Sequence, residues 1–430
     1  MSAPGGRVPS RPTNTMRVRI HRGSREIGGN CVEIEAQGKR LVIDLGRPLS
    51  AQPDEHVPLP AIAGLAGGDP SLLGLVISHP HLDHYGLANQ VSPKVPIFIG
   101  EAANRILREA AFFSRASFAI PAAGFLVHRK AFQLGPFRVT PYLNDHSAFD
   151  AYSLLVEADG KRLFYSGDIR ASGRKAKLFR QLLADPPVGI DVLLMEGTHV
   201  RAAEAPVRAG GTESDVESAC LQTMRETDGL VLAYYSAQNI DRLVTLYRAA
   251  VRAGRELVVD LYTVAIAVAT GSKGVPQPGH DKLRVFLPHN QRLQVLRGKA
   301  FARTSAVKAC RIYWDEIAAR TGRLVMTMRG TTERELVKAN VLGGANAIWS
   351  LWDGYLSVRS GQGSVEFCRR HGIPLLVHHA SGHAGVTDLQ RLVAAIDPRR
   401  VVPIHSEAAG RFADLFPRVV CHDDGELWEA

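Results

Sequence analysis

Short apolar runs recur along the chain, and several of them lead directly into histidine or aspartate. One run covers residues 72–78 and predicts a buried strand that delivers the following segment to the end of a sheet. Two further runs, residues 163–166 and 401–404, lead to Asp168 and His405. Continuous apolar runs of this length are typical of strands buried on both faces. The pattern therefore predicts a sheet-based core with polar residues gathered at strand ends.

A second pattern, an alternation of helical and strand periodicity, follows residue 210. We expect Ser214 to cap the first helix, with Glu217 three residues on completing a capping box. Gly254 closes the second helix. Such strand–helix alternation indicates an open parallel α/β sheet. The predicted elements are helix 211–226, strand 230–234, helix 240–253 and strand 257–261.

The segment at residues 79–84 reads H-P-H-L-D-H and carries three imidazoles and one carboxylate. In an extended chain residues i and i+2 lie on the same side, so His79 and His81 can share one metal ion. Asp83 and His84 come after the chain turns and can face a second ion. Zinc accepts both kinds of donor and keeps a position open for water in catalytic sites. A polar loop that is rich in histidine by chance is the weaker alternative, because the spacing is tight.

The H-x-H-x-D-H pattern after a strand resembles the signature of the metallo-β-lactamase fold. This resemblance implies that His146 is the third histidine of the first metal and that Asp168 is the carboxylate bridging both metals. It also implies that His405 is the last histidine of the second metal. Asp44, in the run L-V-I-D-L-G at residues 41–46, would support the ligands without binding metal directly.

More than half of the chain separates Asp168 from His405, although both should meet at one site. A large insertion must therefore lie between them, and a metallo-β-lactamase core with an α/β insertion resembles the β-CASP family of nucleases. The family's motif A matches E-G-T at Glu196, its motif B matches H-A-S-G-H-A with His383, and its motif C falls on His405. The resemblance covers nearly all of residues 16–430 and is closest to ribonuclease J and the mRNA 3′-processing endonucleases.

The expected fold is therefore α/β, a metallo-β-lactamase αββα sandwich with an inserted β-CASP parallel α/β domain. Residues 1–15, rich in Pro, Gly, Ser and Arg, are expected to be a disordered tail. The predicted domains are a first part of the core at 16–198, the insertion at 199–370, and a second part of the core, with motifs B and C, at 371–430.

The resemblance also implies a mechanism, in which two divalent ions hold a hydroxide that attacks a phosphodiester. The first ion would be bound by His79, His81, His146 and Asp168, and the second by Asp83, His84, Asp168 and His405. Asp83 or Asp168 would orient the hydroxide, and His383, tuned by Glu196, would protonate the leaving oxygen. His379 and Ser381 either contact a neighbouring substrate phosphate or only pack their loop. Zinc is the favoured ion and manganese the alternative.

One departure from the family pattern is H-S-E at His405, where the family has H-G-E, so Ser406 is expected to narrow the site locally. Two other features suggest a nucleic-acid partner. The formal charge is +10, and residues 282–311 hold eight basic residues and no acidic one, which forms either a surface that follows phosphates or a solvated helix face. Trp349, Trp352 and Tyr355 either stack bases or belong to the core.

Three classes of function fit these features. The favoured one is a ribonuclease acting on single-stranded RNA in the cytoplasm, without a membrane, and a homo-oligomer stays open. Five scattered cysteines without a C-x-x-C pair argue for that reducing compartment. The alternative is a DNA nuclease or a small-substrate metallo-hydrolase acting on a thioester or lactone. The third is an inactive scaffold, against which the filled ligand positions weigh. His378, beside motif B, is a further open candidate.

Overall fold

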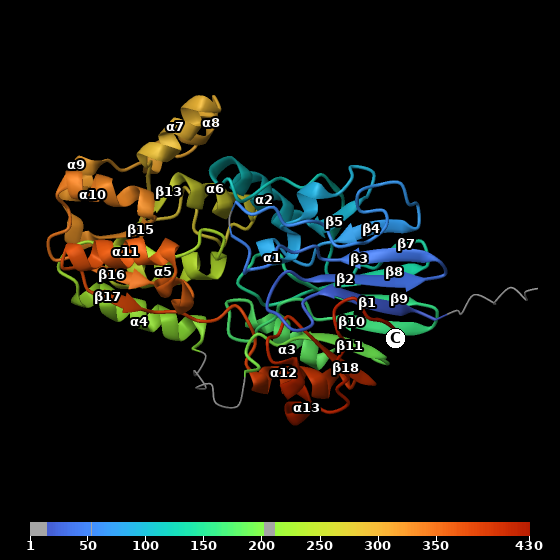
Figure 1. Ribbon diagram of the computed structural model, residues 1–430. Helices are drawn as coiled ribbons and strands as arrows, with labels where there is room; N and C mark the ends of the chain where they lie inside the picture. The colour runs from blue at the N-terminus through green and yellow to red at the C-terminus, as the bar shows by residue number, and fades with distance from the viewer. Residues whose placement is uncertain (1–14, 53, 202–210) are drawn as a thin grey trace, which may run out of the picture.

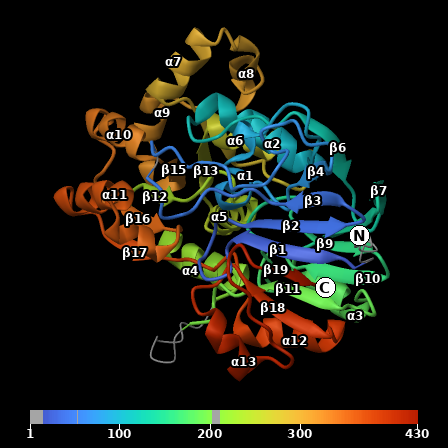
Figure 2. The same ribbon diagram turned by 45° about the vertical axis from the view of Figure 1, so that its right-hand side comes forward.

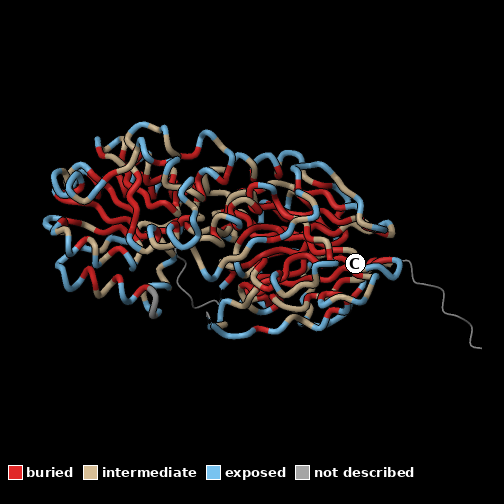
Figure 3. Tube along the Cα trace, turned by 90° about the horizontal axis from the view of Figure 1, so that it is seen from above, coloured by how far each residue is buried: buried red, intermediate tan, exposed pale blue. Residues whose placement is uncertain are grey.

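The computed structural model describes residues 15–52, 54–201 and 211–430, which form two lobes (Figure 1). The predicted tail falls outside these residues apart from Thr15. Seen from above, each lobe has buried strands at its centre and exposed loops and helix faces at its rim (Figure 3). The larger lobe contains both chain ends of the described part, because β19 pairs with β1.

The larger lobe is built from two sheets. The first has seven strands in the order β19-β1-β2-β3-β4-β5-β6, and the second has six in the order β18-β11-β10-β9-β8-β7. The first consists of β1 (Arg17–Arg22), β2 (Cys31–Ala36), β3 (Lys39–Ile43), β4 (Leu72–Val76), β5 (Ile97–Gly100), β6 (Ala122–Leu126) and β19 (Leu427–Glu429). The second consists of β7 (Phe132–Leu134), β8 (Phe137–Leu143), β9 (Tyr152–Ala158), β10 (Lys161–Tyr165), β11 (Val192–Glu196) and β18 (Arg400–Ile404).

The two sheets pack face to face and each carries helices on its outer face. Side chains such as Val18 and Ile34 of the first sheet share one buried cluster with Leu154 and Leu194 of the second. Helices α1 (Leu82–Tyr85) and α2 (Glu101–Phe113) cover the first sheet. The second is covered by α3 (Ala176–Ala184), α12 (Val386–Ile396) and α13 (Phe412–Leu415). The predicted αββα sandwich is confirmed.

The smaller lobe is a six-stranded parallel sheet in the order β14-β13-β15-β12-β16-β17. Its strands are β12 (Val231–Tyr234), β13 (Glu256–Asp260), β14 (Leu283–Phe286), β15 (Leu324–Met328), β16 (Asn346–Trp349) and β17 (Leu375–Val377). One face packs against α4 (Glu213–Glu226), α5 (Ile240–Arg252) and α6 (Leu261–Ala269), the other against α9 (Trp314–Ala318), α10 (Glu333–Ala339) and α11 (Arg359–Arg370). Helices α7 (His289–Arg297) and α8 (Phe301–Ser305) project at the top of Figure 1. The predicted inserted parallel α/β domain is confirmed.

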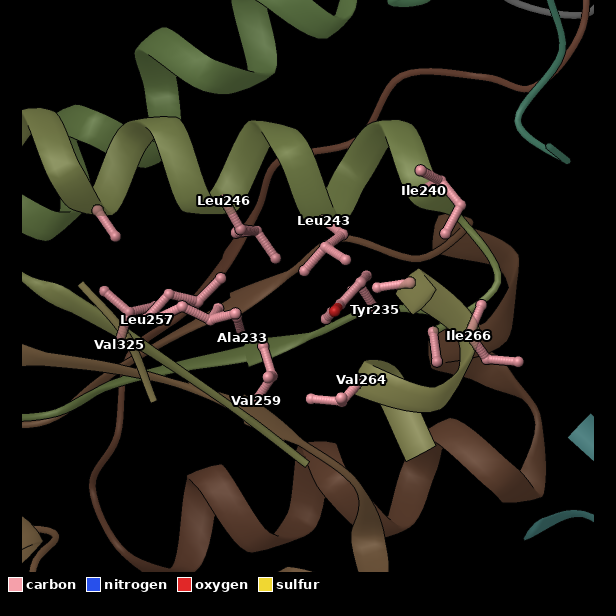
Figure 4. Packing of buried hydrophobic residues seen from close by; sticks show 14 of the residues in the cluster. Ala233, Tyr235, Ile240, Leu243, Leu246, Leu257, Val259, Val264, Ile266 and Val325 are labelled. Atoms are coloured by element: carbon pink, nitrogen blue, oxygen red, sulfur yellow. The ribbon is translucent and has the colours of Figure 1, made fainter. Parts of the chain in front are cut away.

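The packing of α5 shows why the sequence folds in this way. Ile240, Leu243 and Leu246 recur at helical spacing and point from α5 onto the sheet (Figure 4). They meet strand residues such as Leu257 and Val325, whose neighbours along the strands face the opposite cluster. Burying each of these side chains stabilises the fold by about 1.5–3 kcal/mol.

The capping box of α4 differs from the prediction. Thr212 is the N-cap, and its side chain accepts a hydrogen bond from the backbone N–H of Asp215, whose carboxylate accepts one from the backbone N–H of Thr212. Ser214 is exposed within the first turn, and the Glu217 carboxylate forms ion pairs with Arg174 and other arginines. Ser214 and Glu217 have the same three-residue spacing as Thr212 and Asp215. Because Glu217 pairs with arginines from other parts of the fold, the capping box forms between Thr212 and Asp215 instead.

The other predicted elements of the insertion agree with β12, α5 and β13 within one residue at each end. The last strand of its sheet, β17, lies beyond residue 370, in the segment assigned above to the second part of the core. β17 is a three-residue, largely exposed edge strand, so its sequence carries little periodic signal.

The two lobes meet where α2 lies beside α6 (Figures 1 and 2). Ile106 and Ala110 of α2 belong to the buried cluster of the insertion. Arg105 donates from Nε to the Ala269 carbonyl oxygen over 2.9 Å, and Arg303 forms an ion pair with Glu109. These contacts fix the insertion against the sandwich.

Candidate active site

The predicted ligands come from strand ends of both sheets and meet at one edge of the sandwich. His79 follows β4, Asp168 follows β10 and His405 follows β18. In His405 the backbone has φ 55°, a left-handed conformation that a non-glycine residue adopts only when its surroundings enforce it. The His405 carbonyl oxygen accepts from Gly197 N–H over 3.3 Å, and its own N–H donates to the Gly23 carbonyl oxygen over 2.7 Å.

A first group of ligand atoms comes from His79, His81, His146 and Asp168, all within 4.8 Å of one another. His79 Nε2 and His146 Nε2 lie 3.5 and 3.8 Å from Asp168 Oδ2. His81 Nδ1 lies 3.2 Å from His146 Nε2. Burial holds the pKa of His79 and of His146 well below the usual range, which keeps both imidazoles neutral and able to bind a metal.

A second group comes from Asp83, His84, Asp168 and His405, whose ligand atoms also lie within 4.8 Å of one another. His84 Nε2 lies 3.3 Å from Asp168 Oδ2, and His405 Nε2 lies 3.3 Å from Asp83 Oδ2. Asp168 therefore stands between the two groups, at the position predicted for a bridging carboxylate.

The donor atoms of both groups fit divalent cations. His79 Nε2, His84 Nε2 and both carboxylate oxygens of Asp168 are buried and have no hydrogen-bond partner among the described residues. A buried polar atom without a partner costs about 1–3 kcal/mol, so a cluster of them facing one space needs a compensating ligand. Imidazole nitrogen and carboxylate oxygen are donors that zinc prefers.

Asp44 lies behind the ligands, at the end of β3, as the resemblance implies. Its Oδ2 accepts hydrogen bonds of 2.8 Å from Ser78 Oγ and from the Tyr165 hydroxyl, and it lies 2.8 Å from His84 Nδ1. Its Oδ1 accepts from Ser78 N–H over 2.7 Å. Because Asp44 is bonded to His84 Nδ1, the other ring nitrogen, Nε2, faces the metal position.

Two glycines let the backbone close tightly around Asp83. A Cβ on Gly46 would lie 1.7 Å from the Asp83 carbonyl oxygen. A Cβ on Gly28, where φ is +84°, would lie 2.9 Å from the Asp83 Cβ. The Asp83 carbonyl oxygen also accepts from Asn30 N–H over 3.0 Å. The close approach of Gly28, Gly46 and Asn30 therefore fixes Asp83, a member of the second ligand group.

Motifs A, B and C converge beside Asp168. Glu196 Oε2 lies 3.0 Å from His383 Nδ1 and accepts from Thr198 Oγ1 over 2.8 Å. The Thr198 hydroxyl also lies 2.9 Å from His405 Nδ1. Although burial acts in the other direction, the carboxylates of Glu196 and Asp168 raise the pKa of His383 to about 9. His383 thus carries a proton at neutral pH, as a general acid must.

His379 and Ser381 lie on the same loop as His383. Ser381 Oγ accepts from His383 N–H over 3.1 Å and lies 2.7 Å from His199 Nε2. Burial lowers the pKa of His379 to about 4, with the Arg242 guanidinium adding to the effect. A phosphate would therefore meet a neutral imidazole at His379. His199 was missed by sequence reasoning, because a single histidine after motif A carries no spacing signal.

Two completely buried arginines, Arg170 of the sandwich and Arg242 of α5, hold this loop through its backbone. Arg170 Nη1 donates to the Ser381 carbonyl oxygen over 2.9 Å. Arg242 donates to the carbonyl oxygens of His378 and Ala380 over 3.3 and 3.4 Å.

Carboxylates from both lobes balance these arginines. Arg242 Nη2 lies 3.1 Å and Arg170 Nη1 3.6 Å from Glu213 Oε1, and Arg170 also pairs with Asp241. Arg170 Nε lies 3.4 Å from Asp145, the neighbour of His146. We call Arg170, Glu213, Asp241 and Arg242 the buried ion network. Its members lie far apart in the sequence, so no motif predicted it.

Three minor expectations are settled by local contacts. Ser406 is fully buried, faces Gly197, and its Oγ accepts from Ala408 N–H over 3.3 Å, so it packs into the protein rather than narrowing the site. His378 Nε2 lies 2.9 Å from Thr223 Oγ1 of α4, so its ring is held by the insertion. Trp349 is 2% exposed and belongs to the core of the insertion.

The sandwich and the paired ligand groups define a metallo-hydrolase type of site. A family model described as the metallo-beta-lactamase superfamily matches residues 25–199, and one described as the Zn-dependent metallo-hydrolase RNA specificity domain matches residues 376–418. Residues 25–199 thus resemble the metallo-β-lactamase superfamily, and the two matches together support a β-CASP, ribonuclease J-like assignment for the chain.

Known relatives agree with this assignment. The chain is 23% identical over 393 residues to Ribonuclease J of Sinorhizobium meliloti, an alignment that covers 86% of this chain and 64% of that protein. It is 24% identical over 416 residues to Ribonuclease J of Mycobacterium tuberculosis, covering 91% and 68%. The chain thus spans about two thirds of the length of these relatives.

The fold also occurs among solved structures. A protein of unknown function from Enterococcus faecalis V583 superposes with a TM-score of 0.79 at 19% identity, over 97% of this chain and 100% of that one. None of the helices in the described part of the chain has the length and apolar character needed to cross a membrane.

Proposed function

We propose that this protein is a metal-dependent ribonuclease that hydrolyses phosphodiester bonds of single-stranded RNA. The observation that carries the proposal is the pair of ligand groups sharing Asp168, with His383 and Glu196 beside them. The match to an RNA specificity domain over residues 376–418, which contain motifs B and C, supports RNA as the substrate. So do the relatives named Ribonuclease J.

Two divalent ions, zinc in the first place, would be held by the two ligand groups with Asp168 as the shared ligand. Bound there, they would lower the pKa of a water molecule to about 7 and offset the charge of the scissile phosphate. Manganese is the alternative, because the same donors accept it. The Asp44 carboxylate would keep His84 in the tautomer that presents Nε2 to the second ion.

The protein itself supplies the proton for the leaving group. The ring of His383, protonated because Glu196 and Asp168 raise its pKa, would donate that proton to the departing 3′ oxygen. Glu196 would hold the ring through Nδ1, and Thr198 would fix the Glu196 carboxylate. General acid assistance of this kind contributes about 10²–10⁴-fold to the rate.

Ser381 and His379 would contact a phosphate next to the scissile one, with His199 holding the Ser381 hydroxyl. Five free thiols, Cys31, Cys220, Cys310, Cys368 and Cys421, fit a reducing compartment such as the cytoplasm. No contact in the described residues favours DNA or a small thioester or lactone over RNA.

Incubation of the purified protein with 5′-labelled single-stranded RNA and the matching DNA, with zinc, manganese or a chelator, tests the proposal. We expect cleavage of RNA that the chelator abolishes, and a ladder of fragments or released mononucleotide would separate endonuclease from exonuclease action. Intact RNA in a sample with metal bound at full occupancy would refute the proposal.

A further inference from the structure

One loop of the insertion leaves its sheet beside the motif B loop. Strands β16 and β17 are parallel neighbours, so the segments that follow them emerge at the same edge of the sheet. After β17 the chain enters residues 378–383, and after β16 it enters Ser350 and the single helical turn η5 (Asp353–Ser357). Ser350 Oγ donates to the His378 carbonyl oxygen over 2.5 Å, which ties the two segments together. In open α/β sheets this edge is where ligands bind.

The loop after β16 carries an exposed pair of aromatic side chains. Trp352 and Tyr355 are 54% and 44% exposed, in contrast to the buried Trp349. Their ring centroids lie 5.4 Å apart at an interplanar angle of 85°. A Cβ on Gly354 would lie 2.3–2.5 Å from three atoms of the Trp352 ring, so the indole rests directly on the glycine backbone. The glycine thus lets the indole lie against the chain while much of its surface stays open to solvent.

The pair lies on a segment that is fixed to the motif B loop. Ser350, two residues before Trp352, donates to the His378 carbonyl oxygen, and Arg242 donates to the carbonyl oxygens of Ser350 and His378 over 2.8 and 3.3 Å. The aromatic pair therefore stands on the loop next to the one that carries His383.

We propose that Trp352 and Tyr355 form a stacking site for a nucleobase of the RNA strand whose phosphodiester lies at the two ligand groups. This inference rests on the proposed ribonuclease function and adds a base-binding contact to it. Every nucleobase has a π face, so stacking of this kind binds single strands with little sequence preference. The two ligand groups would hold the phosphate through their cations, and the insertion would hold the base.

Equilibrium binding of fluorescein-labelled oligoribonucleotides tests the proposal. The experiment uses the zinc-loaded full chain in a His383→Ala background, which should slow cleavage by about 10²–10⁴-fold, and a set of oligonucleotides with an abasic nucleotide at each position in turn. We expect the abasic change to weaken binding at one position by about five-fold to a hundred-fold. Trp352→Ala should weaken binding of the intact RNA by a similar factor and abolish the additional penalty of that abasic change.

Three further variants separate stacking from a general loss of structure. Tyr355→Phe keeps the ring and should bind like the parent, whereas Tyr355→Ala should bind more weakly. Gly354→Ala keeps both rings but forces the indole to move, and it should cause a smaller loss of the same sign. Phe125→Ala on β6 removes another aromatic, 48% exposed and outside the basic stretch, and is the matched control that should leave the affinity unchanged.

The outcomes distinguish this proposal from the function on which it rests. If the wild type cleaves RNA but Trp352→Ala, with full zinc content, binds intact and abasic RNA as its parent does, the stacking site is refuted and the ribonuclease stands. If the wild type neither binds nor cleaves RNA, both are refuted. An equal loss in Phe125→Ala and Trp352→Ala would also contradict a specific base contact.

Discussion

The metal-ligand groups and the motif B loop lie side by side, yet they are held in place in different ways. The ligands are side chains at strand ends of the sandwich, and His79, His84 and Asp168 keep buried donor atoms unpaired. The motif B loop, residues 378–383, is instead held by its backbone. Its carbonyl oxygens accept hydrogen bonds from Arg242, Arg170 and His146. The accepting carbonyl groups are those of His378, Ala380, Ser381 and Gly382. The first region would be completed by cations, whereas the second is already completed by the protein itself.

This difference indicates that one region provides metal binding and the other positions His383. The ligand groups belong to the sandwich alone, so metal binding should not depend on the insertion. The motif B loop is fixed from both lobes, since Arg170 comes from the sandwich and Arg242 and Glu213 from the insertion. We infer that the insertion acts on catalysis by positioning His383 rather than by binding the metal.

The largest effect is expected at the ligands. His81→Ala removes a donor of the first ligand group and should reduce RNA cleavage to the level seen with a chelator. The circular dichroism spectrum should stay that of the wild type, because His81 is only partly buried and lies at a strand end. Metal analysis should show a lower zinc content, and full cleavage in a clean His81→Ala preparation would contradict the two-group assignment.

A smaller loss is expected from His383→Ala. The turnover number should fall by about 10²–10⁴-fold. Zinc content should stay unchanged, because His383 is not a member of the two predicted ligand sets. Single-turnover cleavage alongside metal analysis checks both, and loss of zinc together with activity would place His383 among the metal ligands instead.

The pH profile of the turnover number tests the role of Glu196. In the proposed mechanism His383 gives its proton to the leaving oxygen, so activity should fall as the pH rises through its pKa, which Glu196 and Asp168 raise to about 9. Glu196→Gln removes one of these charges, lowers the pKa of His383 and should move the alkaline loss of activity to lower pH. An unchanged alkaline limb in Glu196→Gln would show that another group limits the reaction.

The ligand groups can be predicted from the sequence, whereas the contacts that hold the motif B loop cannot. The sequence indicates the members of the two candidate ligand groups because each follows an apolar run and their order matches a known pattern, and the structure brings these side chains together. The buried ion network was not predicted, because Arg170, Glu213 and Arg242 follow no common spacing and only the fold brings them together. The capping box of α4 was wrong for a similar reason, since Glu217 is drawn to Arg174 by tertiary contacts.

Breaking the buried ion network should affect stability and catalysis but not metal binding. Arg242→Met leaves Glu213 buried without its closer arginine partner and should lower the free energy of unfolding by about 3–5 kcal/mol. The turnover number should fall while zinc content is kept, and Arg242→Lys should restore part of both. Denaturant unfolding, metal analysis and kinetics check the three readouts, and loss of zinc in a folded variant would contradict the separation of the two regions.

The smallest effect is expected on the surface of α7 and the turn that follows it. Arg297 and Lys299 are exposed in the basic stretch, so replacing both by alanine should weaken RNA binding without changing the turnover number. Each lost phosphate contact should reduce the slope of log affinity against log salt by about 0.7. Binding at several salt concentrations measures it, and an unchanged slope would favour a solvated helix face.

Zinc titration of metal-free protein tests the two-ion centre most directly, with bound metal and RNA cleavage followed in the same samples. We expect activity to appear only as the second equivalent binds, with His81→Ala failing to reach it and Arg242→Lys reaching it normally. RNA cleavage by the metal-free protein, or full activity with a single bound ion, would contradict a centre built on two ligand groups that share Asp168.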